Sequence, residues 1–180
     1  MSNYQEVIKF WFDETQPESW WKKDENFDQQ VRQRFLDVYQ QAASCELFAW
    51  RQHAHGWLAE IIVLDQFPRN MFRETAQAFA TDQLAVVLSQ EAVANEVDKE
   101  LTAVQKSFLY MPLMHSESPL IHETAVDLFS QPGLEFNLEF ELKHKAIIDR
   151  FGRYPHRNEI LGRVSTDEEL EFLKQPGSSF

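Results

Sequence analysis

The sequence has few of the residues that cross-links and tight turns require. Cysteine occurs once, at Cys45, which excludes an internal disulfide and is typical of a reducing compartment. Five glycines and seven prolines in 180 residues are few for an all-β sandwich with its many turns. The sequence contains no glycine-rich phosphate loop, which excludes the two common nucleotide-binding motifs.

Long apolar runs and a positive charge balance are also lacking. Apolar stretches such as Ile61-Ile62-Val63-Leu64 are far shorter than the ~20 residues of a membrane span, and residues 1–7 do not resemble a signal peptide. The formal net charge of −12 argues against non-specific binding to nucleic acid or to anionic membranes. We therefore expect a cytoplasmic protein that binds neither nucleic acid nor membrane.

Apolar residues at helical spacing are abundant. The chain is 43% hydrophobic and holds 24 aromatic residues, which is the composition of a chain with a packed core. With no linker or low-complexity stretch, residues 1–180 are predicted to form a single all-α domain of about eight helices. Helix starts are expected at Asp24, Asp82, Thr102 with Gln105, Ser118-Pro119 and Ser165-Thr166-Asp167-Glu168, and helix ends at Pro68 and Gly152.

One segment has the periodicity of a strand. Apolar and polar residues alternate strictly from Leu134 to Leu142, but the chain offers no second run of this kind to pair with it. We therefore expect a helix from about residue 137 onward.

Two segments that end helix-like runs carry most of the arginines. They are residues 65–70 (DQFPRN) and residues 151–158 (FGRYPHRN), and six of the nine arginines lie in or beside them. Residues 150–164 alone sum to +3, from four arginines and Glu159. The planar guanidinium group suits bidentate binding of carboxylates or phosphates. The residues predicted to bind a small anionic ligand are Arg69, Asn70, Arg73, Arg153, His156, Arg157, Asn158 and Arg163.

The arginines also have a purely structural interpretation. Asp65, Asp82, Glu117 and Asp149 are available to pair with them and to lock the loops together. The two interpretations are compatible if the ion pairs orient some of the arginines toward a cleft. If the two segments lie close together and open to solvent, a ligand site is favoured.

Histidines near the same segments are candidates for proton transfer. Asp65 with His115 or His144 is the pair we expect to be catalytic, because an unperturbed imidazole titrates near pH ~6.5. A helix-end role for His115 and a semi-buried structural role for His144 are the alternatives. His122-Glu123 lacks the second histidine of a zincin motif, so we predict no metal site, and no cofactor is expected.

Long motifs along nearly the whole chain resemble one bacterial family, the domain of unknown function 924, which is assigned to the tetratricopeptide-like superfamily. The motifs are FWF (10–12), WW (20–21), FD (27–28), LDQFPRN (64–70), AFATD (78–82), FLYMPLMHSE (108–117), FGRYPHRN (151–158) and LGRVST (161–166). The resemblance implies antiparallel helix pairs in a compact, right-handed, tetratricopeptide-like (TPR-like) stack and implies no known reaction. Cys45 departs from the glycine, and His122 from the glutamine, that the family more often has.

Two functions follow as hypotheses, and whether the protein is an enzyme stays open. The first is a helical protein that binds, or binds and acts on, a small anionic metabolite in an arginine-rich cleft formed by the two segments. The second is a non-catalytic scaffold that binds a protein or peptide partner, with the arginines as internal ion pairs. Trp11-Phe12 and Trp20-Trp21 are expected to cover the end of the helical stack, with a recognition surface as the alternative.

Overall fold

The computed structural model describes residues 3–180. The predicted single domain spans residues 1–180, so its first two residues, Met1 and Ser2, lie outside the described part. This part contains eight α-helices and no strand, as predicted. The helices are α1 (Tyr4–Lys9), α2 (Glu25–Ala43), α3 (Ala54–Met71), α4 (Asp82–Ala94), α5 (Ala103–Met114), α6 (Pro119–Phe129), α7 (Glu135–Phe151) and α8 (Asp167–Leu173). Short 3₁₀ turns and one π turn join them. Over residues 3–180, no helix combines the length and the apolar character that crossing a membrane requires.

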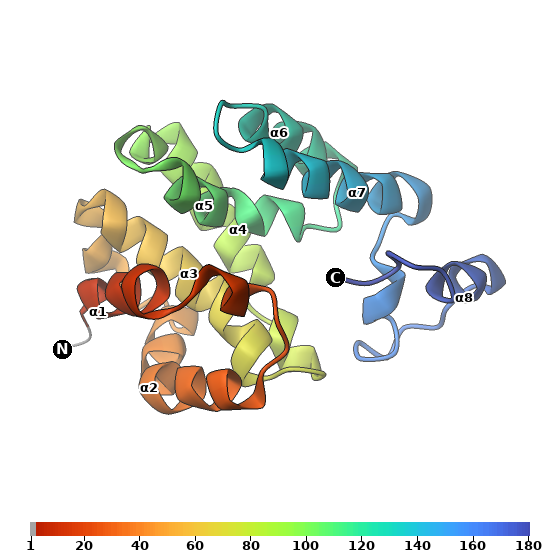
Figure 1. Ribbon diagram of the computed structural model, residues 1–180, viewed down its shortest axis with the longest axis horizontal. Helices are drawn as coiled ribbons and strands as arrows, with labels where there is room; N and C mark the ends of the chain where they lie inside the picture. The colour runs from red at the N-terminus through yellow and green to blue at the C-terminus, as the bar shows by residue number, and fades with distance from the viewer. Residues whose placement is uncertain (1–2) are drawn as a thin grey trace.

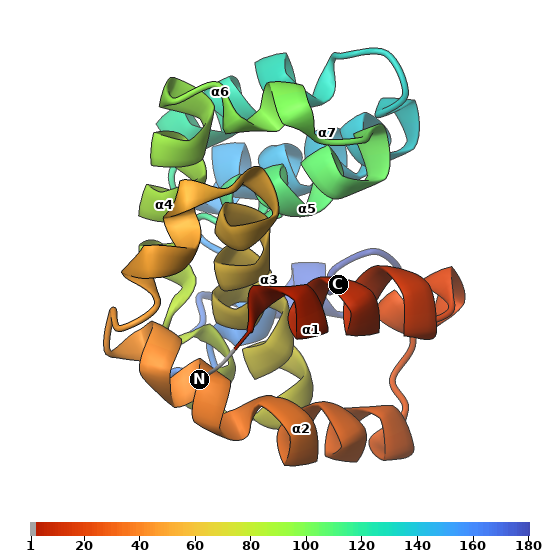
Figure 2. The same cartoon turned by 90° about the vertical axis from the view of Figure 1, so that its left-hand side faces the viewer.

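Helix α3 is the central element of the fold. It packs against α1, α2, α4 and α5, and it lies between α1–α2 on one side and α5–α7 on the other (Figures 1 and 2). The side chains of Leu58, residues 61–64 and Phe67 are completely buried. This burial agrees with its nearly uniform apolar surface, which is typical of a helix at the centre of a fold.

The prediction that Pro68 ends this helix is wrong. Helix α3 continues to Met71 with Pro68 inside it. Proline has no N–H to donate to the carbonyl four residues earlier, which is that of Leu64. The hydroxyl of Thr81 donates to the Leu64 carbonyl oxygen at 2.6 Å instead, so the acceptor that proline frees is satisfied from outside the helix.

The predicted helix starts are mostly confirmed. Asp24 caps α2 by accepting hydrogen bonds from two backbone N–H groups, and Thr102 forms a capping box with Gln105 at α5. Ser118 precedes α6, which begins at Pro119, but its side chain makes no capping hydrogen bond. The last capping box lies one residue later than expected, between Thr166 and Glu169.

The segment with strand-like alternation is helical, as expected. Helix α7 begins at Glu135, two residues before the predicted start, and ends at Phe151. Gly152 follows it with a φ of 69°, the left-handed conformation typical of a helix end, as predicted. Phe136 is 63% exposed and Leu142 is 50% exposed. The alternation therefore arises because several apolar residues of this segment lie on the surface.

The N-terminal aromatic residues enter the core rather than cover it. Trp11 and Phe10 are fully buried, and the Trp11 ring packs edge-on against Phe67 and Phe108. The Trp20 ring stacks on Trp11 with the ring centres 6.1 Å apart, and its Nε1–H donates to the Trp11 carbonyl oxygen at 3.1 Å. Trp21 differs from the others because it is 55% exposed.

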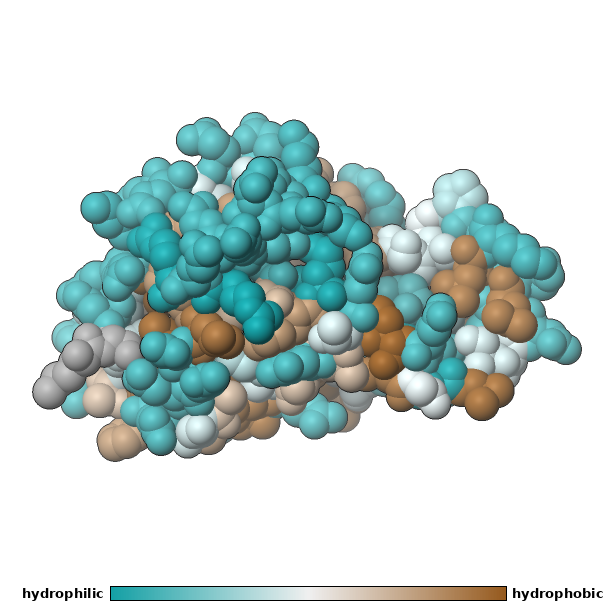
Figure 3. Space-filling model, turned by 90° about the horizontal axis from the view of Figure 1, so that it is seen from below, coloured by the Kyte–Doolittle hydropathy of each residue, from teal (hydrophilic) through white to brown (hydrophobic). Residues whose placement is uncertain are grey.

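The C-terminal part forms a smaller unit at one end of the molecule. After α7 the chain turns back below that helix, makes the 3₁₀ turn Pro155–Arg157 and continues into α8, which lies at the right-hand end in Figure 1. Ile147, Ile148 and Tyr154 form a small hydrophobic cluster separate from the main core. Seen from below, brown hydrophobic surface is exposed where the larger and smaller parts of the molecule meet (Figure 3).

Candidate functional site

A cleft of about 570 Å³ lies beside α3 and is closed by the C-terminal part of the chain. Its wall is formed by side chains of α3, α5 and α7, of the Trp20–Lys22 segment and of the chain after α7. The volume is within the usual range of small-molecule sites, ~300–1,000 Å³. The polar residues of its wall are Lys22, Gln66, Arg69, Asn70, Arg73, Glu74, His115, Asn137, His144, His156 and Arg157.

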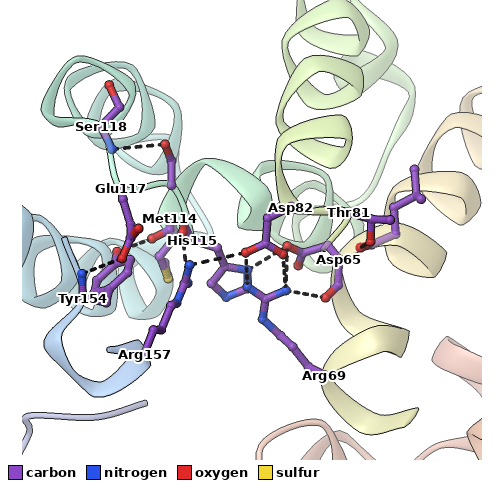
Figure 4. Close-up of polar contacts among 12 residues, drawn as sticks. Asp65, Arg69, Thr81, Asp82, Met114, His115, Glu117, Ser118, Tyr154 and Arg157 are labelled. Carbon is purple, nitrogen blue, oxygen red and sulfur yellow. Dashed lines mark hydrogen bonds and ion pairs between the residues drawn. The ribbon is translucent and has the colours of Figure 1, made fainter. Parts of the chain in front are cut away.

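The two arginine segments meet at Asp82, the first residue of α4. Arg69 donates from Nη1 and Nη2 to the two carboxylate oxygens of Asp82, at 2.7 and 2.9 Å. Arg157 approaches the same carboxylate with Nη1 at 3.4 Å and donates from Nη2 to the His115 carbonyl oxygen at 3.0 Å. Figure 4 shows the two guanidinium groups converging on Asp82 from different elements. The fold therefore brings together segments that are more than eighty residues apart in the sequence.

Asn70 and Arg73 share a carboxylate that sequence reasoning did not single out. Arg73 donates from Nε and Nη2 to the two oxygens of Asp28 at 2.6 and 2.7 Å, and Asn70 donates to Asp28 Oδ1 at 2.8 Å. Both side chains line the cleft. Asp28 is part of the FD motif (27–28), one of the motifs that carry the family resemblance. That motif was the signal in the sequence that could have identified Asp28 as a site residue.

Arg153, Asn158 and Arg163 lie outside the cleft wall. They connect the segment after α7 to α8 and to the loop after α5. Arg153 forms a bidentate pair with Glu169, and Arg163 forms one with Glu117, with N–O distances of 2.7–2.9 Å. Asn158 is buried and accepts a hydrogen bond from Arg163 Nε at 2.9 Å. These three residues hold the backbone that presents His156 and Arg157 to the cleft.

The carboxylates predicted to pair with the arginines do so with one exception. Asp65, Asp82 and Glu117 contact arginine side chains, whereas Asp149 pairs with Lys145 along α7. The hydrogen bond from Arg163 and the Tyr154 backbone N–H hold the pKa of Glu117 below its usual value despite its burial. The structural interpretation of the arginine cluster therefore accounts for most of its hydrogen bonds.

Of the two predicted proton-transfer pairs, the structure brings together Asp65 and His115. His115 Nδ1 lies 2.8 Å from Asp65 Oδ1, and Gln66 also donates to this carboxylate, at 2.6 Å. Burial alone would raise the pKa of Asp65, but the His115 ring and Arg69, whose Nη1 is 3.5 Å away, outweigh it and lower the pKa to about 2. Burial and the Arg69 charge lower the pKa of His115. Asp65 is therefore a carboxylate that accepts a hydrogen bond from a neutral imidazole.

His144 and His156 lie on the cleft wall, and neither has a carboxylate partner among residues 3–180. The Nδ1 atom of His144 donates to the Phe140 carbonyl oxygen at 2.7 Å. Burial lowers the pKa of His144 to about 3, and burial with the neighbouring Arg157 charge lowers that of His156 to about 4. Both imidazoles are neutral near pH ~7.

Two features near the site gave no signal in the sequence. His122 and Glu141 form a completely buried pair, with Nδ1 and Oε1 2.5 Å apart, and His122 Nε2 donates to the Ser116 carbonyl oxygen at 2.8 Å. Burial raises the pKa of Glu141. The ring of Phe180 stacks on His144 with the ring centres 3.7 Å apart. Both pairs join residues from different elements, which residue spacing does not reveal.

The described residues give no indication of a metal centre. No group of three or more His, Cys, Asp or Glu side chains within residues 3–180 has an arrangement that could hold a metal ion. Cys45 is exposed and is not part of the cleft.

The fold and the cleft define an all-α protein with one arginine- and histidine-lined hollow, and comparison with known proteins identifies its family. Residues 7–177 match the family model described as bacterial protein of unknown function (DUF924). The chain therefore belongs to the DUF924 family, which confirms the resemblance seen in the sequence. It is similar to the solved structure of the protein of unknown function ATU0120 from Agrobacterium tumefaciens. The two are 38% identical with a TM-score of 0.91, over 95% of this chain and 96% of that one. No curated protein matches the chain.

Proposed function

We propose that the cleft binds a small organic anion with a planar or apolar body. The observation that carries this proposal is the combination of charge and ring surface in one hollow. Four of the five charged side chains of the cleft wall are cations, namely Lys22, Arg69, Arg73 and Arg157, and the fifth is Glu74. The three arginines are paired with carboxylates behind the wall, so the site offers a few cationic donors rather than a broad basic surface, which favours a small anion over a long polyanion.

The paired arginines keep unused hydrogen-bond donors. A guanidinium group has ~5 N–H donors. Arg73 uses two of them on Asp28, and its Nη1 makes no hydrogen bond to the described residues. Lys22 also lines the cleft and forms no ion pair within residues 3–180. The Arg73 Nη1 group and the Lys22 ammonium group are therefore the donors that a carboxylate or phosphate would meet.

The remainder of the wall is suited to the body of such a ligand. Aromatic rings from several elements surround the hollow: Trp20, Trp21, Phe79, Phe136, Phe140, Tyr154 and Phe180. Sites for small molecules are mostly apolar, with a few polar groups that orient the ligand. We expect organic carboxylates with a ring to bind more tightly than inorganic phosphate or sulfate.

The test is thermal unfolding with a panel of aromatic carboxylates, aliphatic dicarboxylates, phosphate and sulfate. A ligand at a hundredfold excess over its Kd stabilises by about 2.7 kcal/mol, which corresponds to a rise in Tm of roughly 5–11 °C for a chain of this length. Lys22→Gln and Arg73→Gln should weaken binding about fivefold or more. Lys174→Gln, which changes an exposed lysine outside the cleft, should leave it unchanged.

The outcome against the proposal is equally definite. Absence of a ligand-dependent shift across the panel would show that the cleft does not bind this class of molecule. Equal weakening by Lys22→Gln and Lys174→Gln would show that binding depends on general charge rather than on the cleft.

A peptide-binding scaffold is the second candidate, favoured by exposed rings at the rim of the cleft. Trp21 is 55% exposed, Phe136 63% and Phe180 52%. Such rings can anchor a partner's apolar side chains. In this candidate, successive helices form the tetratricopeptide-like stack that the family assignment implies. The packing of α5 on α6 and of α6 on α7 supports this arrangement.

For either candidate we propose the cytoplasm as the compartment, in keeping with one free cysteine.

A further inference from the structure

Three histidines from three different elements share the wall of the cleft. His115 follows the last residue of α5, His144 lies within α7, and His156 lies in the turn Pro155–Arg157. Imidazole is the side chain most often used to transfer protons near neutral pH. Whether any of the three can do so depends on which ring nitrogen carries the hydrogen and which one is free.

The hydrogen bonds fix the tautomer of His115 and of His144. The partner of His144 Nδ1 is the backbone carbonyl of Phe140, which can only accept, so Nδ1 carries the hydrogen. The partner of His115 Nδ1 is the Asp65 carboxylate, whose low pKa keeps it ionised, so this Nδ1 is also the donor. In a neutral imidazole the other nitrogen then has a free lone pair. Both rings therefore have Nε2 as their basic atom.

The Nε2 atoms are both unpartnered and reachable. Neither His115 Nε2 nor His144 Nε2 forms a hydrogen bond to the described residues, and neither is among the buried side-chain atoms left without a partner. His122 provides the contrast, because both of its ring nitrogens are engaged and its side chain is completely buried. His122 is fixed as a structural residue, whereas the other two present a lone pair to the cleft.

The surroundings favour His115 over His144 as the base. Burial lowers the pKa of both rings, so the difference between them is the carboxylate partner, which His115 has and His144 lacks within residues 3–180. The Asp65 carboxylate beside His115 would stabilise an imidazolium as it forms, since it lies against the ring nitrogen opposite the accepting one. The His115 backbone is also held, by the hydrogen bond from Arg157. The charged groups that act on His115 are Asp65, Arg69 and Asp82.

We propose that His115 Nε2 is a general base, oriented by Asp65, that removes a proton from a carbon acid bound in the cleft, with His144 Nε2 accepting a hydrogen bond from the ligand. This inference rests on the binding function proposed above and names its substrate class, an organic anion with an acidic C–H beside a carbonyl group. The C–H bond breaks, its electron pair moves into the carbonyl, and the proton passes to Nε2. Return of the proton to a neighbouring atom completes an isomerisation that needs no co-reactant.

The test uses nitrobenzisoxazole, a planar carbon acid that opens in one step to a coloured phenolate when a base removes its proton. Wild-type protein should open it with saturation kinetics, and His115→Gln should lower the rate by about a hundredfold or more, which is the range that general bases contribute. Asp65→Asn should lower the rate and shift its pH profile. His55→Gln, which changes an exposed histidine on α3 outside the cleft, should change neither.

Nitrogen NMR of wild-type protein tests the same inference without a variant that could fail to fold. His115 should show a protonated Nδ1 and an unprotonated Nε2 at neutral pH. A protonated Nε2, or equal rates for wild type and His115→Gln, would overturn the proposal. If organic anions stabilise the protein but nitrobenzisoxazole is not opened, the base is refuted and the binding function stands. If nitrobenzisoxazole is opened but no organic anion competes, the binding function and the proposed substrate class are both refuted, and His115 is only a reactive base.

Discussion

Replacing Asp82 with asparagine should destabilise the protein far more than the loss of one ion pair normally does. Asp82 is the carboxylate at which Arg69 and Arg157 meet, and its side chain is only 13% exposed. The two guanidinium groups are also mostly buried, with exposed fractions of 19% and 8%. Asp82→Asn keeps the shape of the side chain but removes its charge, and it places an amide donor opposite an arginine donor.

The magnitude follows from what remains after the change. Removing one partner of a buried ion pair costs about 3–5 kcal/mol, because an uncompensated charge stays buried. Here two cations lose a shared anion, although Arg69 keeps its contact with Asp65 and Arg157 keeps the His115 carbonyl. We therefore expect a loss of about 3–5 kcal/mol from a total stability of roughly 5–15 kcal/mol. The corresponding fall in Tm is roughly 6–20 °C for a chain of this length.

The assay is urea unfolding followed by circular dichroism, with Asp149→Asn as the matched control. Asp149 pairs with Lys145 on the surface of α7, where the two side chains are 49% and 24% exposed, so its loss should cost no more than about 1 kcal/mol. The double variant with Arg157→Gln should show coupling of about 0.5–3 kcal/mol to Asp82→Asn. If Asp82→Asn costs less than about 1 kcal/mol, the reasoning that this carboxylate joins the two segments is refuted.

Three further predictions concern the backbone and the buried histidines. Gly56→Ala should cost at least about 3 kcal/mol in urea unfolding, because its Cβ would lie 1.9 Å from the Trp50 carbonyl oxygen. Cys45→Gly should stabilise the protein by about 0.5–1 kcal/mol, because Cys45 has a φ of 59°, where glycine is unstrained. Stability should fall from pH ~6.5 toward pH ~4.5, by at most about 1.4 kcal/mol per pH unit for each of His144 and His156. Their pKa values are lowered to about 3 and about 4 in the folded protein, so the unfolded chain binds protons first as the pH falls.

Each of these predictions has a control. Gly162→Ala meets no atom within 4 Å and should cost only the left-handed strain, about 1–2 kcal/mol. Ser44→Gly, at a φ of −89°, should destabilise rather than stabilise. His144→Gln should reduce the slope of stability against pH, and an unchanged slope would show that His144 does not stay neutral on acidification.

The sequence predicts the helices well where their signals are local. Asp24 and the Thr102–Gln105 capping box act within four residues of themselves, and both are confirmed. The predicted end at Pro68 failed because the compensating donor, Thr81, lies beyond the helix in the sequence and reaches back through the fold. A rule based on neighbouring residues contains no information about such a contact.

The same limit applies to the candidate site. The two arginine segments were found from composition alone, and the structure brings Arg69 and Arg157 to one carboxylate. The sequence did not reveal which arginines line the cleft. Arg153 and Arg163 pair with Glu169 and Glu117 outside the cleft, whereas Arg157, which lies between them in the sequence, lines it. Which arginine faces the cleft depends on the 3₁₀ turn Pro155–Arg157, whose geometry the spacing of the arginines does not reveal.

The ion-pair network and the cleft are parts of one arrangement. Arg157 donates to the backbone of His115, and Asp65 contacts both Arg69 and the His115 ring, so the groups that join the segments also orient the proposed base. An arginine network that served only to hold the loops would have no need for imidazoles with a reachable, unpartnered Nε2. Substitutions in this network should therefore disturb His115 less the farther they lie from it. Asp82→Asn, which contacts both arginines, should shift the pH profile of nitrobenzisoxazole opening, whereas loss of the Arg153–Glu169 pair by Glu169→Gln should change stability alone.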